Sequence, residues 1–236
     1  MKRLYTFFMA AALCLSSNAA TPINVVNGIS QELAVSRAAI VSNITYDLTF
    51  NIPASKTEAV KGNATITFIY KGSKTDLQLD FQGAPSQFDG LCVVNGKQIA
   101  VAWQDEHILI PRKALRRGKN IISMSFISGD KSLNRNADYL YTLFVPEHAR
   151  SVFPCFDQPD LKALFRTRLN VPEGWKTITS VSTERIPTYL FSFVAGKFSK
   201  QTLERNGRTF TALYRETDAK KAVSYTHLTL PTTSRV

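Results

Sequence analysis

Histidine and glutamate side chains are the residues of this sequence that could bind a catalytic zinc ion. The usual site needs two histidines one helical turn apart, a more distant third ligand and a glutamate that activates water. The chain of 236 residues has three histidines, His107, His148 and His227, and no two of them have this spacing. We therefore predict neither a metal site nor a catalytic centre in these residues.

Two aspartates, Asp157 and Asp160, are close enough in sequence to be considered as a paired general acid and base. Pro159 lies between them, and the cations Arg150 and Lys162 lie on either side. A charge among large apolar residues is tolerated only when it is paired or hydrogen-bonded. Structural ion pairs with these cations are therefore favoured over acid and base catalysis.

The cysteines give no sign of redox or metal chemistry. Apart from Cys14 near the N-terminus, the chain has only Cys92 and Cys155, which belong to no CxxC or Cys/His motif. Two cysteines so far apart do not make a disulfide framework, even in an exported protein. Both are predicted to be buried thiols that pack in the core.

The stretch from Tyr139 to Pro172 is where turn-forming, aromatic and charged residues are most concentrated. Its four prolines fix φ and remove backbone donors, so it cannot form one regular helix or strand. We expect short strands joined by tightly specified turns.

Three ordered motifs in and after this stretch resemble one known family. The first reads ARSVFPCFDQPDLKALF from Ala149, with LNVPEGW following from Leu169; the second spans Ile186 to Phe198, and the third spans Tyr214 to Asp218. Together they resemble the N-terminal domain of zinc aminopeptidases of the aminopeptidase N family, which are gluzincin metallopeptidases. The resemblance covers residues 36–221, and its first half depends on strand pattern more than on motifs.

The resemblance implies an all-β, saddle-like N-terminal domain, an antiparallel β-sandwich, that covers one side of a catalytic domain. It also implies that the zinc ligands, the glutamate base and the exopeptidase motif belong to a missing catalytic domain. The full-length parent would use Zn²⁺ to hydrolyse single residues from peptide N-termini, and this fragment alone would be inactive. If the domain docks on that partner, Tyr139 to Val145 should form part of an exposed apolar patch.

The resemblance also points to possible contacts with the peptide substrate. In this family a glutamine a few residues before the pair Ala149 and Arg150 commonly reaches the substrate amine, and the matching position here is Val145. Glu147 and His148 lie nearby and are possible residues of the substrate rim. A turn in which Glu147 forms an ion pair is the favoured alternative.

The N-terminus has the three parts of a secretory signal peptide. Two basic residues precede an apolar run from Leu4 to Leu15, and a small-residue region ends at Ala20. The run is too short to span a bilayer, so we expect export to a periplasm or outside the cell, with no membrane span after cleavage. Lipidation at Cys14 is a weaker interpretation, because Leu13 precedes it. Residues 21–35 are predicted to be a flexible leader.

Alternation of apolar and polar residues predicts most of the strands. They cover residues 44–52, 60–70, 77–81, 108–110, 122–126, 165–171 and 210–214. Asn95 and Gly96 between two apolar runs predict a hairpin, because both central residues of a type I′ turn need positive φ. Many short strands joined by turns indicate an antiparallel β-sandwich.

Three further expectations concern single segments. Tyr189 to Ala195 is apolar nearly throughout, which is typical of a strand buried on both faces. Gly62 is a candidate β-bulge. No helical period is sustained over ten residues after the signal peptide, so no helix is expected beyond a single turn at Arg112 to Leu115.

Residues 223–236 do not follow the strand and turn pattern of the preceding chain. They begin VSYTHLTLPT, which resembles the conceptual translation of a sequencing adapter. We predict that they are a scar, that the β domain of residues 36–222 is incomplete, and that the natural protein continues beyond Ala222. The segment between Trp175 and Thr188 is also shorter than is usual in the family.

The formal net charge of +11 does not indicate a nucleic-acid partner. Residues 112–113 and 116–117 form the only local basic cluster, and no aromatic residues are interleaved with them. A solvated turn is the favoured interpretation of this cluster.

A rival function from a different class is a secreted β-sandwich module that binds glycans or peptides by itself. The signal peptide and the strand pattern would suit such a module. Trp103 and Trp175 are too far apart to form a tandem aromatic platform on one strand, which argues against it.

Overall fold

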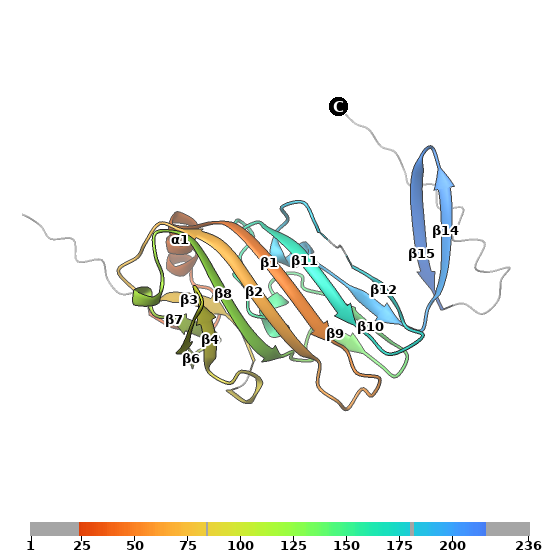
Figure 1. Cartoon of the computed structure of the whole chain (residues 1–236), viewed down its shortest axis with the longest axis horizontal. Helices are drawn as coiled ribbons and strands as arrows, with labels where there is room; N and C mark the ends of the chain where they lie inside the picture. The colour runs from red at the N-terminus through yellow and green to blue at the C-terminus, as the bar shows by residue number, and fades with distance from the viewer. Residues whose placement is uncertain (1–23, 84, 180–181, 216–236) are drawn as a thin grey trace, which may run out of the picture.

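The computed structural model describes residues 24–83, 85–179 and 182–215 (Figure 1). The predicted signal peptide of residues 1–20, the first three residues of the predicted leader and the predicted scar of residues 223–236 lie outside the described residues. In the described part, strands form four sheets and the helices are short, which confirms the predicted all-β class. None of the helices described is long and apolar enough to cross a membrane.

The largest sheet has six strands and forms one layer of the molecule. Its order is β11 (Ala163–Asn170), β1 (Val41–Asn51), β2 (Lys61–Tyr70), β8 (Gly118–Ile127), β4 (Leu91–Val94) and β5 (Lys97–Ala100). Neighbouring strands are antiparallel except β1 and β11, which run parallel with Ile44 opposite Ala163. Buried and less buried residues alternate along β1 and β2, because successive side chains point to opposite faces.

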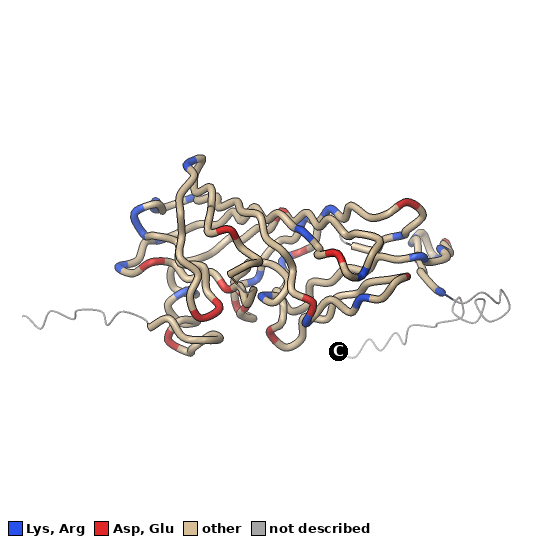
Figure 2. The backbone as a smooth tube through the Cα atoms, turned by 90° about the horizontal axis from the view of Figure 1, so that it is seen from below, with Lys and Arg blue, Asp and Glu red and all other residues tan. Residues whose placement is uncertain are grey.

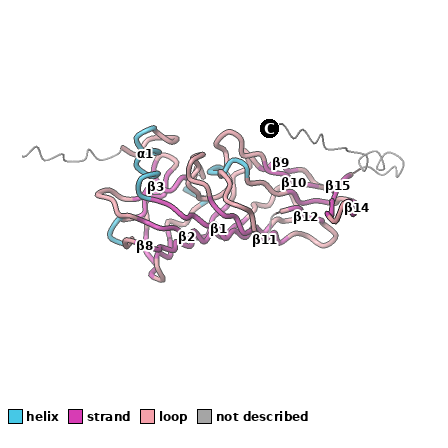
Figure 3. Tube along the Cα trace, turned by 90° about the horizontal axis from the view of Figure 1, so that it is seen from above, coloured by secondary structure: helices cyan, strands magenta, loops and turns pink. Residues whose placement is uncertain are grey.

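A four-stranded sheet forms a second layer. Its order is β12 (Lys176–Ile178), β13 (Val194–Gly196), β10 (Tyr139–Thr142) and β9 (Leu133–Arg135). Figure 3 shows the layer of β8, β2, β1 and β11 on one side and the layer of β9, β10 and β12 on the other. This two-layer arrangement is the predicted sandwich.

Two smaller sheets complete the described structure. The three-stranded sheet has the order β3 (Leu77–Asp80), β7 (His107–Ile110) and β6 (Ala102–Gln104), and the hairpin of β14 (Ser199–Arg205) and β15 (Arg208–Tyr214) extends from one end of the molecule (Figure 1). The helical elements are α1 (Gln31–Ile40) and four 3₁₀ turns: Pro85–Gln87, Arg112–Ala114, Ala149–Ser151 and Thr188–Leu190. The 3₁₀ turn at Arg112–Ala114 and the hairpin at Asn95 and Gly96, with φ of 51° and 84°, confirm two of the local predictions.

Aromatic side chains fill the space between the two layers. Tyr46 of β1 stacks on Phe165 of β11 with ring centroids 5.0 Å apart, and Phe165 stacks on Phe191 at 4.5 Å. Phe153 and Phe156 are fully buried, and the N–H of Phe156 donates to the Tyr46 hydroxyl at 2.8 Å. Burial of each ring stabilises the fold by roughly 1.5–3 kcal/mol. The proline-rich stretch therefore holds the two layers together.

Helix α1 corrects two predictions: a leader that extends to residue 35, and no helix after the signal peptide. Ser30 caps its first turn by accepting a hydrogen bond from the N–H of Leu33 at 3.2 Å. Only Leu33 and Arg37 are buried on the helix. Because one of these two is charged, no apolar stripe marks the helix in the sequence.

Two strand predictions are also wrong in detail. Residues 188–190 form a 3₁₀ turn in which Leu190 is 54% exposed, and the strand itself is only β13, so this segment packs one side and not both. The bulge of this sheet lies in β1, whereas pairing of β2 with β8 continues through Gly62. A Cβ atom on Gly62 would lie 2.3 Å from the Phe126 ring, so glycine there permits close packing.

Candidate functional site

The turn that follows β10 carries the two residues predicted for the substrate rim. The N–H of His148 donates to the carbonyl oxygen of Phe144 at 2.8 Å, and the His148 side chain is half-buried. The Glu147 carboxylate accepts a hydrogen bond from Nη1 of Arg150 at 3.1 Å, and the Glu147 side chain is 50% exposed. The predicted ion pair of Glu147 is confirmed. Contact of Glu147 or His148 with a substrate stays a prediction.

Arg150 joins this turn to two other parts of the molecule. Its Nε atom lies 3.5 Å from Oε2 of Glu106, which belongs to the turn between β6 and β7. Glu106 also accepts hydrogen bonds from Nε2 of Gln82 at 2.6 Å and from the N–H of Gly28 at 3.2 Å. The Arg150 side chain is only 8% exposed, so these contacts compensate a largely buried charge.

The two aspartates of the central stretch do not form the predicted side-chain ion pairs. Oδ2 of Asp157 accepts from the backbone N–H of Arg150 at 3.0 Å, and Oδ1 of Asp160 accepts from Nε2 of Gln158 at 2.9 Å. In the described part of the chain, neither carboxylate pairs with the side chain of Arg150 or Lys162. The reason is that two glutamates engage the Arg150 guanidinium, while the Asp157 carboxylate accepts from the backbone N–H of Arg150 instead.

A buried polar cluster lies beneath the turn, and no sequence motif marks it. Oδ1 of Asp80 accepts from Nη1 of Arg37 at 2.6 Å and lies 3.0 Å from Nδ1 of His107, while Oδ2 accepts from the N–H of Asp157 at 2.8 Å. Nε of Arg37 donates to Oε1 of Gln158 at 2.7 Å. Thus α1, β3, β7 and the central stretch meet around one carboxylate. Asp80 occupies one of the alternating polar positions of β3, which in the sequence indicates a solvent-facing side chain.

The electrostatics of this cluster suit a structural role. Burial acts to raise the pKa of Asp80, but the Arg37 guanidinium and the His107 ring lower it below its usual value. Burial raises the pKa of Asp157 to about 6, and a backbone N–H opposes the rise. Nε2 of His107 lies 2.9 Å from the carbonyl oxygen of Gly28, which ties the segment before α1 to β7. We assign the cluster to the stability of the domain.

The described residues do not fit a zinc site. They contain no group of three histidine, cysteine, aspartate or glutamate side chains that could hold a metal ion. Cys92 and Cys155 are free and buried, as predicted. Burial raises the pKa of Cys92 to about 12, so its thiol stays protonated near neutral pH.

An exposed apolar face lies on the four-stranded sheet and on the turn after β10. We define it by Tyr141, Leu143, Val145 and Ile178, whose exposed fractions are 42%, 58%, 51% and 44%. Tyr141 and Ile178 flank Val194 in the strand register, so they are neighbours across the sheet. The predicted exposure of the segment Tyr139 to Val145 is confirmed at these alternate positions. Docking of a partner on them stays a prediction.

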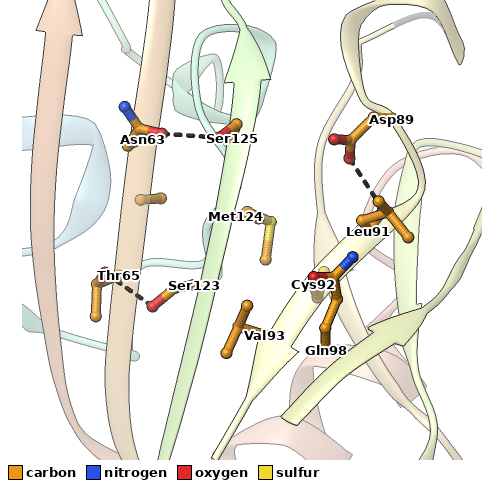
Figure 4. Close-up of a pocket in the computed structure, with 11 residues that line it drawn as sticks. Asn63, Thr65, Asp89, Leu91, Cys92, Val93, Gln98, Ser123, Met124 and Ser125 are labelled. Atoms are coloured by element: carbon orange, nitrogen blue, oxygen red, sulfur yellow. Dashed lines mark hydrogen bonds between the residues drawn. The ribbon is translucent and has the colours of Figure 1, made fainter. Parts of the chain in front are cut away.

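A pocket of about 410 Å³ lies between β8 and β4, which pair at only two positions (Figure 4). The polar side chains on its β2 and β8 wall are satisfied by each other: Thr65 with Ser123 at 2.9 Å, and Ser125 donating to Asn63 at 2.8 Å. Asp89 accepts from a backbone N–H at 2.9 Å. Because these groups are already paired, we assign this pocket no ligand.

Comparison with known proteins identifies the domain. Residues 128–190 match the family model described as Peptidase M1 N-terminal domain. The chain contains a Peptidase M1 N-terminal domain. The match covers β9, β10, the turn of Glu147 and His148, and the central stretch, which contains most of the first motif of the sequence resemblance. Most of the second motif and all of the third lie beyond the matched residues.

Named relatives of this M1 domain are aminopeptidases. Aminopeptidase N of Streptomyces lividans is 30% identical over 143 residues, which are 49% of this chain and 16% of that protein. Endoplasmic reticulum aminopeptidase 2 of Homo sapiens is 26% identical over 210 residues, which are 74% of this chain and 22% of that protein. The chain therefore spans less than a quarter of the length of these relatives.

Solved structures share the fold of this M1 domain. An M1 zinc metallopeptidase from Deinococcus radiodurans superposes with a TM-score of 0.56 and 18% identity, over 73% of this chain and 46% of that one. Among the other solved structures, a mutant of a two-domain M1 zinc metallopeptidase is bound to L-tryptophan, and a mutant of the Deinococcus radiodurans enzyme is bound to a Tyr-Ser-Ala substrate. At this identity the likeness shows the fold alone, and it confirms the predicted N-terminal architecture.

Proposed function

We propose that this M1 N-terminal domain belongs to an exported zinc aminopeptidase whose catalytic domain follows it. The parent enzyme would use Zn²⁺ to activate water and would hydrolyse single residues from peptide N-termini. The observation that carries the proposal is the match of residues 128–190 to the M1 N-terminal domain, in a chain that spans 16% of an aminopeptidase N. Periplasmic or extracellular export is supported by the signal-peptide pattern of residues 1–20.

In this proposal the domain forms one side of the active-site region and performs no chemistry by itself. The apolar face of Tyr141, Leu143, Val145 and Ile178 would pack against the catalytic domain, because exposed apolar residues gathered in this way are typical of interaction sites. Glu147 lies at the edge of this face and offers a half-exposed carboxylate that could accept a hydrogen bond from the substrate ammonium.

The first experiment is to sequence the locus beyond the codon for Ala222. We expect the frame to continue and to encode a His-Glu-x-x-His motif followed by a more distant glutamate. A continuous frame without that motif would contradict the proposal.

The second experiment compares the recovered full-length protein with the present chain. Both should be assayed on aminoacyl p-nitroanilide substrates, with and without a zinc chelator. We expect activity that the chelator abolishes in the full-length protein, and none in the present chain. Chelator-sensitive activity in the present chain would show that the domain carries its own site.

Export is tested separately by expressing the full-length protein in a bacterial host and measuring the mature N-terminus by mass spectrometry. Cleavage after Ala19 or Ala20 and recovery from the periplasm or medium are expected. Retention of Met1 in a cytosolic product would overturn the export part of the proposal and leave the enzymatic part standing.

A further inference from the structure

Two loops lie side by side at one end of the sheets. Residues 71–76 connect β2 to β3, and residues 111–117 connect β7 to β8. The strand register places Tyr70 opposite Gly118 and Leu77 opposite Ile110. The first loop therefore starts beside the end of the second loop and ends beside its start. A pocket of about 610 Å³ lies between them.

The two loops concentrate positive charge around this pocket. They contain six lysines and arginines and one carboxylate, Asp76, which gives 6 − 1 = +5 of the formal net charge of +11. Arg112, Lys113 and Arg117 line the pocket. Among the described residues, the side-chain nitrogens of these three have no hydrogen-bond or ion-pair partner, and Asp76 accepts from the backbone N–H of Arg112 at 2.9 Å. Figure 2 shows lysine and arginine positions in the loops at this end, remote from the β14 and β15 hairpin.

One residue that lines the pocket carries a buried hydroxyl. Tyr70 is 3% exposed and lines the pocket. Its hydroxyl interacts with the side chain and backbone of Ser73, but no hydrogen bond of normal geometry forms. Burial raises the pKa of Tyr70, so the hydroxyl keeps its proton near neutral pH and can donate it. A buried hydroxyl without a well-formed hydrogen bond weakens a fold, so the Tyr70 hydroxyl is available to an acceptor that enters beside it.

The loop backbone lies close to one of the cations. Gly72 has φ of +99°, and a Cβ atom there would lie 3.4 Å from Nε of Arg117. That distance is an ordinary van der Waals contact, so the Arg117 guanidinium lies beside the loop of residues 71–76. Close contact of this kind limits the freedom of a long side chain and lowers the entropy lost when it binds a ligand.

We propose that this pocket binds a tetrahedral oxyanion of the phosphate type, carried either by a small soluble molecule or by a lipid headgroup. The two guanidinium groups and the ammonium group only donate hydrogen bonds, and arginine matches phosphate oxygens with two parallel hydrogen bonds. The pocket keeps a net charge of +2 after the Asp76 carboxylate is subtracted from the three cations. Its only aromatic ring, that of Tyr70, is buried, so no platform is available for stacking a nucleic-acid base.

The test uses the full chain and inorganic pyrophosphate as the soluble probe, with binding measured by titration calorimetry at low ionic strength. Arg112→Gln with Arg117→Gln should weaken binding roughly tenfold or more, since two charge-assisted contacts are lost. Tyr70→Phe should weaken it roughly threefold to tenfold. The matched control is Arg168→Gln with Lys176→Gln, which removes two exposed cations outside the pocket and should leave affinity within about twofold. Thermal melting of each variant verifies that it is folded.

The lipid source is tested by sedimentation with phosphatidylcholine vesicles that contain phosphatidylglycerol, compared with vesicles of phosphatidylcholine alone. Retention on the anionic vesicles that is lost in the Arg112 and Arg117 variant assigns a lipid headgroup, whereas pyrophosphate binding without retention assigns a soluble ligand. Either result supports the oxyanion site. Binding of neither probe overturns it, and so does an equal loss in the control variant, which would show general attraction to a basic protein.

Discussion

The buried polar cluster and the exposed apolar face are close in sequence and opposite in character. Asp157 and Gln158 belong to a cluster in which Arg37, Asp80 and His107 are at most 1% exposed. Fewer than twenty residues earlier, Leu143 and Val145 leave more than half of their surface in solvent. Both regions reverse the usual distribution of polar and apolar side chains.

The difference lies in how the reversal is compensated. In the cluster, the Asp80 carboxylate has a guanidinium, an imidazole and a backbone N–H within 3.0 Å, so the domain itself compensates the buried charge. The apolar face has no such compensation among the described residues, because nothing covers Leu143 or Val145. The cluster therefore serves the fold of this domain, and the face fits a partner outside it.

The largest effect is expected when the central carboxylate of the cluster is removed. Asp80→Asn leaves the Arg37 guanidinium buried without its counter-ion, which should lower the free energy of unfolding by about 3–5 kcal/mol in urea denaturation. Asp47→Asn is the matched control, because Asp47 is 43% exposed and its Oδ1 lies 3.5 Å from Nη1 of Arg166. The control should lose less than about 1 kcal/mol. Equal losses in the two variants would show that the cluster has no special role.

The next effect depends on pH and concerns Asp157, whose folded-state pKa burial raises to about 6. An unfolded aspartate has a pKa of about 3.9, so the native state binds the proton of Asp157 more tightly than the unfolded state does. The stabilisation that comes from this proton is complete below a pH of about 3.9. The contribution is lost as pH rises through the folded pKa. Between pH 4 and pH 7 the wild type should therefore lose about 1–3 kcal/mol of unfolding free energy relative to Asp157→Asn, which does not titrate.

This profile is measured by urea denaturation of both proteins at several pH values. Asp80 acts in the opposite direction, because its lowered pKa gives stability that is present above the unfolded pKa and lost on acidification. Both proteins contain Asp80, so the difference between them isolates Asp157. A difference that stays constant from pH 4 to pH 7 would contradict the raised pKa.

A smaller effect is expected for the ion pair at the surface end of the same network. Glu147→Gln removes one of the two glutamates at Arg150, but its side chain is 50% exposed and Glu106 remains. The unfolding free energy should fall by less than about 1 kcal/mol. A loss as large as that of Asp80→Asn would place Glu147 in the structural cluster and remove it as a candidate for substrate contact.

The sequence pattern predicts those features that depend on neighbours along the chain. The alternation in β1 and β2, the hairpin at Asn95 and Gly96, and the burial of Cys92 all follow from local spacing. The motifs of the central stretch also predict the family and the all-β class, which the comparisons confirm.

The features that the sequence does not predict depend on partners far away along the chain. Arg37 meets Asp80 across 43 residues and Gln158 across 121 residues, so neither the helix that carries Arg37 nor the cluster has a local signature. The predicted ion pair of Asp157 with Arg150 is wrong for a similar reason, because two glutamates, one of them the distant Glu106, already engage the Arg150 guanidinium. Exposure of Leu143 and Val145 could be predicted only because the family implies a partner.

The smallest effect on stability is expected at the apolar face. Leu143→Ser with Val145→Ser removes apolar side chains that are already more than half exposed, so the unfolding free energy should change by no more than about 0.5 kcal/mol. The same variant should reduce the fluorescence of a hydrophobic dye and the self-association of the isolated chain by about half, because the two side chains of the face with the highest exposed fractions are gone. Leu91→Ser with Val93→Ser is the matched control, since these residues of β4 are 40% and 39% exposed and lie on the other sheet. Two results would contradict this prediction: an equal loss of dye binding in the control, or a wild type that is a monodisperse monomer and binds no dye. In either case the face is ordinary surface, and its contrast with the buried cluster carries no information about a partner.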